Sequence, residues 1–293
     1  MGHRILVTGA SGNIGYEIVK NLRGRGVDFT AASLGHHEYP TDIRSLQLDY
    51  AHPGLLETAF NDVETLFLLI PMAPNMVDYA RNVVLAARES GIRQIVRSSA
   101  LGANPRSSYI LHRVQGEIDE ILRESGIPTT FVHPNSFMQN FVKFYGESIR
   151  NGALYLPQGE GRTSYVDVRD IASVVVEILI HPERYRGQAF ALTGERPISN
   201  AEALALMSNA AKRRLSYVPV TEEAFVESMR KRGTSQWEID MLMSLHRSVR
   251  EGKTSLVTKT IEAFTGKHPR TLESFCVEKA QAWEKLDIRQ PEV

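Results

Sequence analysis

The feature that most constrains this chain is a glycine triplet close to its start, in the stretch "VTGASGNIG" at residues 7–15. The triplet follows a short apolar run and precedes Ile14, Ile18, Val19 and Leu22, which recur at helical spacing. We therefore expect a strand joined to a helix through glycines, which permit a positive φ and a close approach of another group to the main chain. The first N–H groups of such a helix have no intrahelical partner, so the junction predicts an anion site that suits a diphosphate.

A plain strand-to-helix turn is the alternative, because such turns also favour Gly, Ser and Asn, and loose glycine patterns arise by chance. The position of the motif favours dinucleotide binding. It joins the first strand to the first helix, and a second strand-like run at residues 27–33 completes a βαβ unit.

Strand-like and helix-like stretches alternate through the first half of the chain, which predicts an α/β fold with a Rossmann-type, doubly wound parallel sheet. Further strand-like runs lie at residues 45–50, 65–70, 94–99 and 129–133, and helical candidates lie at 76–90 and 114–125. We expect an NAD(P)-binding domain over residues 1–155 and a smaller, mostly helical, substrate-side region over 156–293. Residues of about 165–195 are expected to return to the Rossmann core, with Asp170 capping a helix.

Composition excludes several classes of function. Lys plus Arg and Asp plus Glu number 34 each, so no basic excess points to nucleic acid. The single cysteine, Cys276, cannot form an intramolecular disulfide and agrees with a reducing compartment. No apolar run is long enough to cross a bilayer, and no secretory leader is apparent, so we expect a cytoplasmic protein without a membrane partner. The nine histidines and the cysteine show no metal-ligand spacing, and no metal site is predicted.

Five segments together resemble the NmrA-like family, an atypical branch of the short-chain dehydrogenases/reductases: "VTGASGNIG", "SSALGA", "LRESGIPTTFVHPNSFMQN", "YVDVRDIA" and "FTGKHPRTLESF". They run from residue 7 to about 275. The resemblance implies a Rossmann-type domain that binds NADPH or NADH, with a small C-terminal region on the substrate side. It also implies two kinds of activity, because the family includes reductases of quinones, azo dyes and triphenylmethane dyes as well as redox-sensing regulators.

The resemblance places a set of residues at the cofactor. Those nearest the diphosphate are Gly9, Ala10, Ser11, Gly12, Asn13 and Ile14. Asp49 and Tyr50 would lie beside the adenine, and Ile70 and Pro71 along the cofactor. Phe137, Met138, Gln139 and Asn140 would flank the nicotinamide, and Ser98 and Gln115 could hydrogen-bond the nicotinamide ribose or the acceptor.

One departure from the family bears on the choice of cofactor. Ser33 stands at the end of the second strand, where the family often has an Arg for the 2′-phosphate of NADP. NAD-specific proteins of this fold have an acidic residue there, which binds the ribose hydroxyls, and after this strand the chain has none before Glu38. A serine with His36 and His37 nearby can still donate hydrogen bonds to a phosphate, so we expect NADP(H) to be favoured over NAD(H). The alternative is that these histidines lie on a surface loop and have no role in binding.

The catalytic residue is not fixed by the sequence, and three candidates arise. Tyr109 and Arg113 have the spacing of a Tyr-x-x-x-Lys pair, but the register of the following helix places the family's usual Lys or His at Gln115, and Arg titrates too high to donate a proton. His133 stands where relatives often have Arg, so it could face the pocket and titrate there, or be only structural.

The sequence lacks the Tyr-x-x-x-Lys pair that supplies a general acid, and this absence bears on the kind of acceptor that the protein can reduce. Quinones and cationic dyes delocalise the electrons that a hydride brings, so they need no strong enzymic acid. We therefore expect an NAD(P)H-dependent oxidoreductase that transfers hydride to a small aromatic electron acceptor of the quinone, azo or triarylmethane type. The alternative is a non-catalytic NADP(H)-sensing regulator with a protein partner. The sequence does not decide whether the protein forms a homodimer. Met241, Leu242, Met243, Leu245 and Val249 form a helical apolar stripe, which is more often core than a substrate cleft.

Overall fold

The computed structural model describes residues 4–284, which form two compact units. Unit 1 comprises residues 4–134, 168–192 and 259–267. Unit 2 comprises residues 135–167, 193–258 and 268–284. The chain therefore passes between the two units several times.

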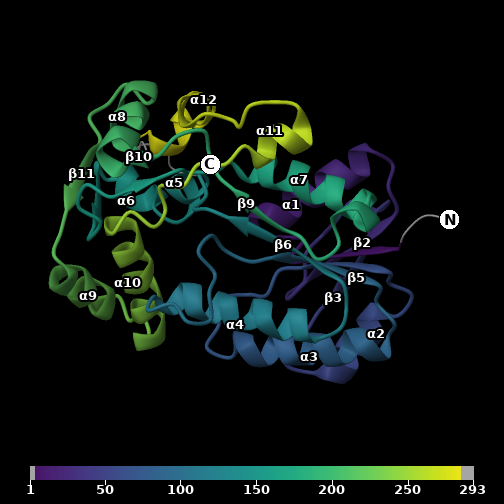
Figure 1. The fold of residues 1–293 in the computed structure, drawn as a ribbon. Coiled ribbons are helices and arrows are strands. Elements are labelled where there is room, and N and C mark those ends of the chain that lie inside the picture. The colour runs from purple at the N-terminus through teal and green to yellow at the C-terminus, as the bar shows by residue number, and fades with distance from the viewer. Residues whose placement is uncertain (1–3, 285–293) are drawn as a thin grey trace, which may run out of the picture. The chain divides into compact units, whose positions relative to one another are not determined.

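Unit 1 is built on a seven-stranded parallel sheet, which confirms the predicted doubly wound α/β fold (Figure 1). In spatial order the strands are β3 (Arg44–Gln47), β2 (Phe29–Ser33), β1 (Ile5–Thr8), β4 (Thr65–Leu68), β5 (Gln94–Ser98), β6 (Thr129–Pro134) and β9 (Ala189–Leu192). The direction of winding reverses beside β1, because the chain first builds outward through β2 and β3 and then returns to β4. Ligands of such sheets bind at this reversal, outside the carboxyl ends of the strands.

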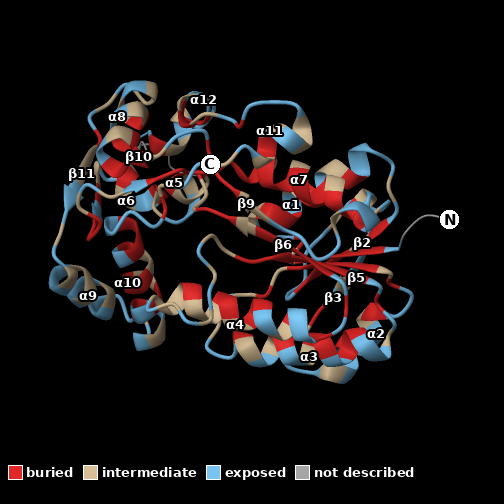
Figure 2. Cartoon of the chain, in the orientation of Figure 1, coloured by how far each residue is buried: buried red, intermediate tan, exposed pale blue. Residues whose placement is uncertain are grey.

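Helices cover both faces of this sheet (Figure 1). One face carries α1 (Asn13–Gly24), α7 (Val168–Ile180) and α11 (Thr260–Thr265); the other carries α2 (Pro53–Phe60), α3 (Met76–Glu89) and α4 (Ile110–Glu124). A short 3₁₀ turn, η1, spans Pro182–Tyr185. Because both faces are covered, every residue of β1 and β4 is buried, and Figure 2 shows the central strands in red.

Three local expectations need correction. The third strand ends at Gln47 rather than Tyr50, because the Asp49 carboxylate accepts the N–H of Ala51 at 2.8 Å and turns the chain. The helix expected from residue 114 already begins at Ile110. Asp170 lies inside the first turn of α7, so it cannot be the residue that caps this helix; a carboxylate in that turn still favours the positive end of the helix dipole.

Unit 2 combines short strands with helices. Its strands are β7 (Ala153–Leu156), β8 (Arg162–Thr163), β10 (Ile198–Ser199) and β11 (Ser216–Pro219), paired as β7 with β11 and β8 with β10. Its helices are α5 (Asn140–Lys143), α6 (Gly146–Arg150), α8 (Asn200–Ala210), α9 (Glu222–Lys231), α10 (Gln236–Arg250), α12 (Leu272–Glu278) and the 3₁₀ turn η2 (Ala280–Trp283).

A separate apolar core holds unit 2 together. Phe141, Leu154, Met207, Phe275 and Trp283 are buried within it. The Trp283 indole N–H donates to the Phe141 carbonyl at 2.8 Å, so the ring is fixed by a hydrogen bond as well as by packing. Among residues 4–284, no helix is both long and apolar enough to cross a membrane.

Candidate functional site

The turn between β1 and α1 is shaped by two different glycine requirements. Gly9 has a φ of +63°, a conformation that residues with a Cβ rarely adopt. A Cβ on Gly15 would lie 2.1 Å from the Gly9 carbonyl oxygen, which means that Gly15 allows α1 to pack against the turn. A Cβ on Gly12 would lie 3.1 Å from the same oxygen, a tight but smaller conflict. Gly9 therefore allows the bend of the turn, and Gly15 allows α1 to pack against it. Gly12 is the least constrained of the three by the protein itself.

The amino end of α1 is open to a ligand. Gly12 is the N-cap residue and provides no side-chain cap, and the first helical hydrogen bond runs from the Tyr16 N–H to the Gly12 carbonyl. Within the described part of the chain, the N–H groups of Asn13, Ile14 and Gly15 donate to no protein atom. Together with the helix dipole, these N–H groups can bind an anion.

A cavity of about 220 Å³ lies at the same edge of the sheet. It is lined by residues that follow β1, β2, β3 and β4: Gly9, Ser11, Gly12, Ala32, Ser33, Leu34, Gly35, Leu48, Tyr50, Leu69 and Pro71. Six of the predicted cofactor residues are among them. The others in unit 1, which are Ala10, Asn13, Ile14, Asp49, Ile70, Ser98 and Gln115, lie outside this lining.

Hydrogen bonds hold the loop after β4 against the cavity. The Tyr50 hydroxyl donates to the Leu69 carbonyl at 2.9 Å, and the Leu69 N–H donates to the Thr8 hydroxyl at 2.9 Å. Tyr50 is fully buried, and burial raises the pKa of its hydroxyl to about 12. Tyr50 therefore acts as a neutral wall of the cavity.

No charged side chain lines this cavity in the described part of the chain. Ser33 is buried at the end of β2, and its hydroxyl lies 2.6 Å from the hydroxyl of Tyr39. One of the two hydroxyls donates in this pair, so the other keeps an O–H free to donate. Desolvation raises the pKa of Tyr39, which keeps its phenol protonated. His36 and His37 are exposed on the intervening loop.

A buried polar cluster lies between β5, β6 and α4, and it includes two of the candidate catalytic residues. Arg97 is 1% exposed, and its guanidinium donates to the Ser98 carbonyl and, at 2.8 Å, to the Gln115 side-chain oxygen. Asp119, also buried, accepts a hydrogen bond from the Ser99 hydroxyl at 2.8 Å. We refer to these residues, with His133, as the Arg97–Asp119 cluster.

His133 and Gln115 are oriented by this cluster. His133 Nε2 lies 2.9 Å from Asp119 Oδ2, within hydrogen-bonding distance. The Gln115 oxygen faces Arg97, which leaves the amide nitrogen as a donor that bonds to none of the described residues. Arg97 Nε and Asp119 Oδ1, 4.0 Å apart, are the buried side-chain nitrogen and oxygen atoms without a hydrogen-bond partner among residues 4–284.

Sequence reasoning missed Arg97 and Asp119. A signal for them exists. Gln115 and Asp119 are four residues apart and share a helical face with buried Ile118 and Leu122, so two polar side chains occupy core positions. Two such residues require a buried partner, and Arg97 is a charged residue that directly follows the apolar pair Ile95 and Val96 in β5.

Tyr109 lies at the N-cap of α4. Arg113, at the lysine-like spacing, donates to the Ser107 carbonyl at 3.1 Å and lies 4.0 Å from Glu117. Its guanidinium therefore has contacts with both a backbone carbonyl and a carboxylate. The role of Tyr109 stays a prediction.

The predicted nicotinamide residues 137–140 belong to unit 2. The Met138 N–H donates to the Val166 carbonyl at 3.0 Å, and the Gln139 amide donates to Asp167 at 3.0 Å. Phe137 forms an isolated parallel bridge with Val166. This segment is therefore held by backbone and side-chain contacts to residues 166–167.

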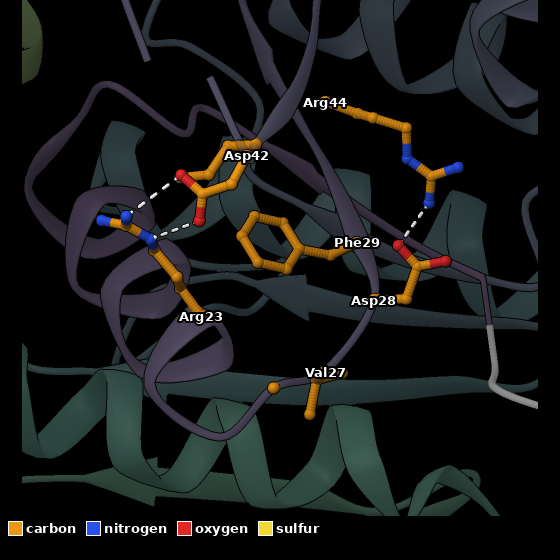
Figure 3. Close-up of a pocket in the computed structure, with 8 residues that line it drawn as sticks. Arg23, Val27, Asp28, Phe29, Asp42 and Arg44 are labelled. Carbon is orange, nitrogen blue, oxygen red and sulfur yellow. Dashed lines mark hydrogen bonds and ion pairs between the residues drawn. The ribbon is translucent and has the colours of Figure 1, made fainter. Parts of the chain in front are cut away.

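A second cavity of unit 1, about 290 Å³, lies at the opposite edge of the sheet, where β2 and β3 begin (Figure 3). Its charged residues are paired with one another: Arg23 with Asp42 at 2.8 Å, and Arg44 with Asp28 at 2.5 Å. Because ligands of parallel sheets bind at the carboxyl ends, this cavity is not the expected site. No cluster of three potential metal ligands occurs within residues 4–284.

The strand order, the glycine turn and the open end of α1 define a protein with a Rossmann-type nucleotide-binding fold. The model of the NmrA-like family matches residues 1–276, so the chain belongs to that family, as the sequence motifs predicted. Its relatives include an NAD(P)H azoreductase of Xenophilus azovorans, which is 33% identical over 95% of this chain and 99% of its own length.

Solved structures show the same fold. A quinone oxidoreductase, QOR2 of Escherichia coli, in complex with NADPH, has a TM-score of 0.82 at 22% identity, with 94% of this chain and 99% of that chain covered. The negative transcriptional regulator NmrA has a TM-score of 0.77 at 17% identity, with 97% of both chains covered.

Proposed function

We propose that this protein is an NAD(P)H-dependent reductase that transfers hydride to a small aromatic electron acceptor of the quinone, azo or triarylmethane type. The NAD(P)H azoreductase of Xenophilus azovorans aligns with this chain over nearly the full length of both, and this similarity supports reductase activity. The observation that carries the proposal is the cavity beside the open amino end of α1, at the carboxyl ends of β1 and β2.

The residues at this edge fit a dinucleotide. The N–H groups of Asn13, Ile14 and Gly15 would bind the diphosphate, and Gly12 would leave room for its oxygens. Tyr50 and Pro71 would line the adenine side. The bound nicotinamide supplies the hydride, and the protein supplies position and exclusion of water.

The cofactor preference follows from Ser33. We propose that NADPH is favoured over NADH, because no carboxylate lines the cavity to bind the ribose hydroxyls or to repel a 2′-phosphate. The free O–H of the Ser33–Tyr39 pair can donate to that phosphate. Titration of cofactor fluorescence tests this: Ser33→Asp should shift the preference towards NADH by about ten-fold, since a hydrogen bond to a charged group contributes roughly 1.5–3 kcal/mol. A wild type that strongly prefers NADH would contradict the proposal.

The protein needs no strong acid for acceptors of this kind, which agrees with the contacts of the candidate residues. Arg113 stands at the position of the lysine in a Tyr-x-x-x-Lys pair, and its guanidinium donates to the Ser107 carbonyl at 3.1 Å. Gln115 offers an amide donor held in place by Arg97, which can position an oxygen of the ligand without titrating. His133 Nε2 is held 2.9 Å from the Asp119 carboxylate. The cytoplasmic location stays a prediction.

The second candidate function is a cofactor-sensing regulator. The absence of a Tyr-Lys pair at Tyr109 and Arg113 favours it, and the shared fold with the regulator NmrA is compatible with it. Tight binding of NADPH without turnover of any acceptor would favour the regulator over the reductase.

A further inference from the structure

Unit 2 contains a cavity of about 840 Å³. Its walls come from the end of α5, from α6, from β7 and from α9 and α10. Every one of its lining residues belongs to unit 2, and none is among the predicted cofactor residues. A volume of this size falls in the range of about 300–1,000 Å³ that small-molecule sites occupy.

One wall of the cavity is α9, a helix whose apolar side is only partly covered by protein. Ala224, Phe225, Ser228 and Met229 recur at helical spacing along α9 and line the cavity. A surface helix ordinarily buries such a stripe against a core, yet no residue of α9 is buried. Phe225 packs on the core of unit 2 and lies 4.8 Å from the His246 ring between centroids, whereas Ala224 and Ser228 are exposed, so protein atoms cover the stripe only in part.

The position of α9 does not depend on a ligand. Thr221 caps its amino end, and Glu222 accepts hydrogen bonds from Arg247 at 2.5 Å and Arg250 at 2.7 Å on α10. These two guanidinium groups lower the pKa of Glu222 to about 2, so the contact persists across the ordinary pH range. An ionic contact therefore joins α9 to α10, and both helices contribute residues to the cavity wall.

The lining is rich in aromatic rings. Phe144 and Tyr155 are 60% and 54% exposed, and Tyr145 and Phe225 complete the aromatic set. Tyr145 is half-buried, and its hydroxyl is not among the buried side-chain atoms that lack a hydrogen-bond partner within residues 4–284. The hydroxyl is therefore available to a ligand of the cavity. The charged residues of the lining, Glu147 and Arg232, have opposite signs, so the cavity favours no net charge.

We propose that this cavity is a binding site for a flat, uncharged aromatic molecule with a polar atom that can pair with the Tyr145 hydroxyl. Aromatic rings stack on such a lining and release water from it. The site goes beyond the proposed reductase function, because it is built without the residues that would hold the cofactor. A second copy of this chain is the competing occupant, since Phe144 and Tyr155 are exposed.

The test uses the full-length protein and a neutral naphthalene fluorophore, N-phenylnaphthylamine, with saturating NADP⁺ present. We expect a saturable, blue-shifted increase in its emission. Ala224→Phe and Ser228→Phe each place a ring in the cavity from an exposed helix position, and each should weaken binding about ten-fold or more. Val277→Phe is the matched control, because Val277 is 74% exposed on α12 and lies outside the cavity.

Several results would overturn the proposal. Absence of saturable binding, or equal affinity in both phenylalanine variants and the control, would show that the cavity does not bind the probe. Displacement of the probe by NADP⁺ would place it in the cofactor site. A dimer in sedimentation that dissociates in Ser228→Phe but not in Val277→Phe would show that a second copy covers this face. Loss of cofactor binding would bear only on the proposed function.

Discussion

Replacing Asp119 by Asn tests whether the Arg97–Asp119 cluster carries charge in the folded protein. Both side chains are almost fully buried, at 1% and 2% exposure, with Arg97 Nε and Asp119 Oδ1 4.0 Å apart. Asp119 Oδ2 also accepts from Ser99 and His133. The amide keeps the shape of the carboxylate but removes the negative charge and one acceptor.

The expected loss of stability has two parts. A hydrogen bond to a charged group contributes about 1.5–3 kcal/mol, and the Arg97 guanidinium is left without its counter-charge. Removal of one partner from a buried ion pair costs about 3–5 kcal/mol in total. Asp119→Asn should therefore lower the free energy of unfolding by that amount, and Arg97→Met should recover part of the loss in the double variant.

Urea unfolding followed by circular dichroism measures these free energies. Asp78→Asn is the control, since Asp78 pairs with Arg81 at 2.6 Å on the exposed side of α3 and should have little effect. A loss below about 1 kcal/mol for Asp119→Asn, or strict additivity with Arg97→Met, would refute the reasoning that the two groups act as a buried charged pair.

Three other predictions concern the turn, the acid and the pH dependence. Gly12→Ala should weaken cofactor binding and leave the fold intact, whereas Gly15→Ala, whose Cβ would meet the Gly9 oxygen at 2.1 Å, should lower the melting temperature; equal melting temperatures would be inconsistent with this division. Tyr109→Phe should leave turnover of a quinone or cationic dye within a few-fold of wild type, because general acid catalysis contributes about 10²–10⁴-fold and none is required; a hundred-fold loss would identify a degenerate Tyr-Lys site. Burial lowers the pKa of His246 from 6.5 to about 4, so the unfolded chain binds a proton that the folded one does not, and stability should fall as the pH drops from 6.5 to 4. The slope should approach about 1.4 kcal/mol per pH unit and be smaller in His246→Gln, as urea titrations at several pH values would reveal.

The parts of the fold that depend on local patterns were predictable. The glycine turn, the strands and the helix at 76–90 follow from spacing within a few residues, and the structure places that helix at Met76–Glu89. The third strand ended early because a single side chain, that of Asp49, bonds to the backbone, which periodicity does not reveal.

The side-chain contacts of the candidate site were less predictable, because they join residues far apart in the chain. Gln115 was expected at the ligand, but its contact with Arg97 depends on how α4 packs over β5. The stripe on α10 was expected to be core, and Met241 and Met243 are buried, while Leu242 lines the cavity of unit 2. The sequence predicts neither the cavity nor the partly covered side of α9. An amphipathic helix has the same residue pattern whether its apolar side packs on a core or lines a cavity.

The central claim is that this chain is an NAD(P)H-dependent reductase of aromatic acceptors, and oxidation of NADPH tests it most directly. The measurement follows the absorbance of the reduced nicotinamide with a panel of quinones, azo dyes and triarylmethane dyes. The account predicts turnover that depends on both enzyme and acceptor, and that is lost in step with cofactor affinity in Gly12→Val, which places a branched side chain where the diphosphate must approach. Tight binding of NADPH with no turnover of any acceptor would contradict the reductase assignment, and absence of NADPH and NADH binding would contradict the site itself.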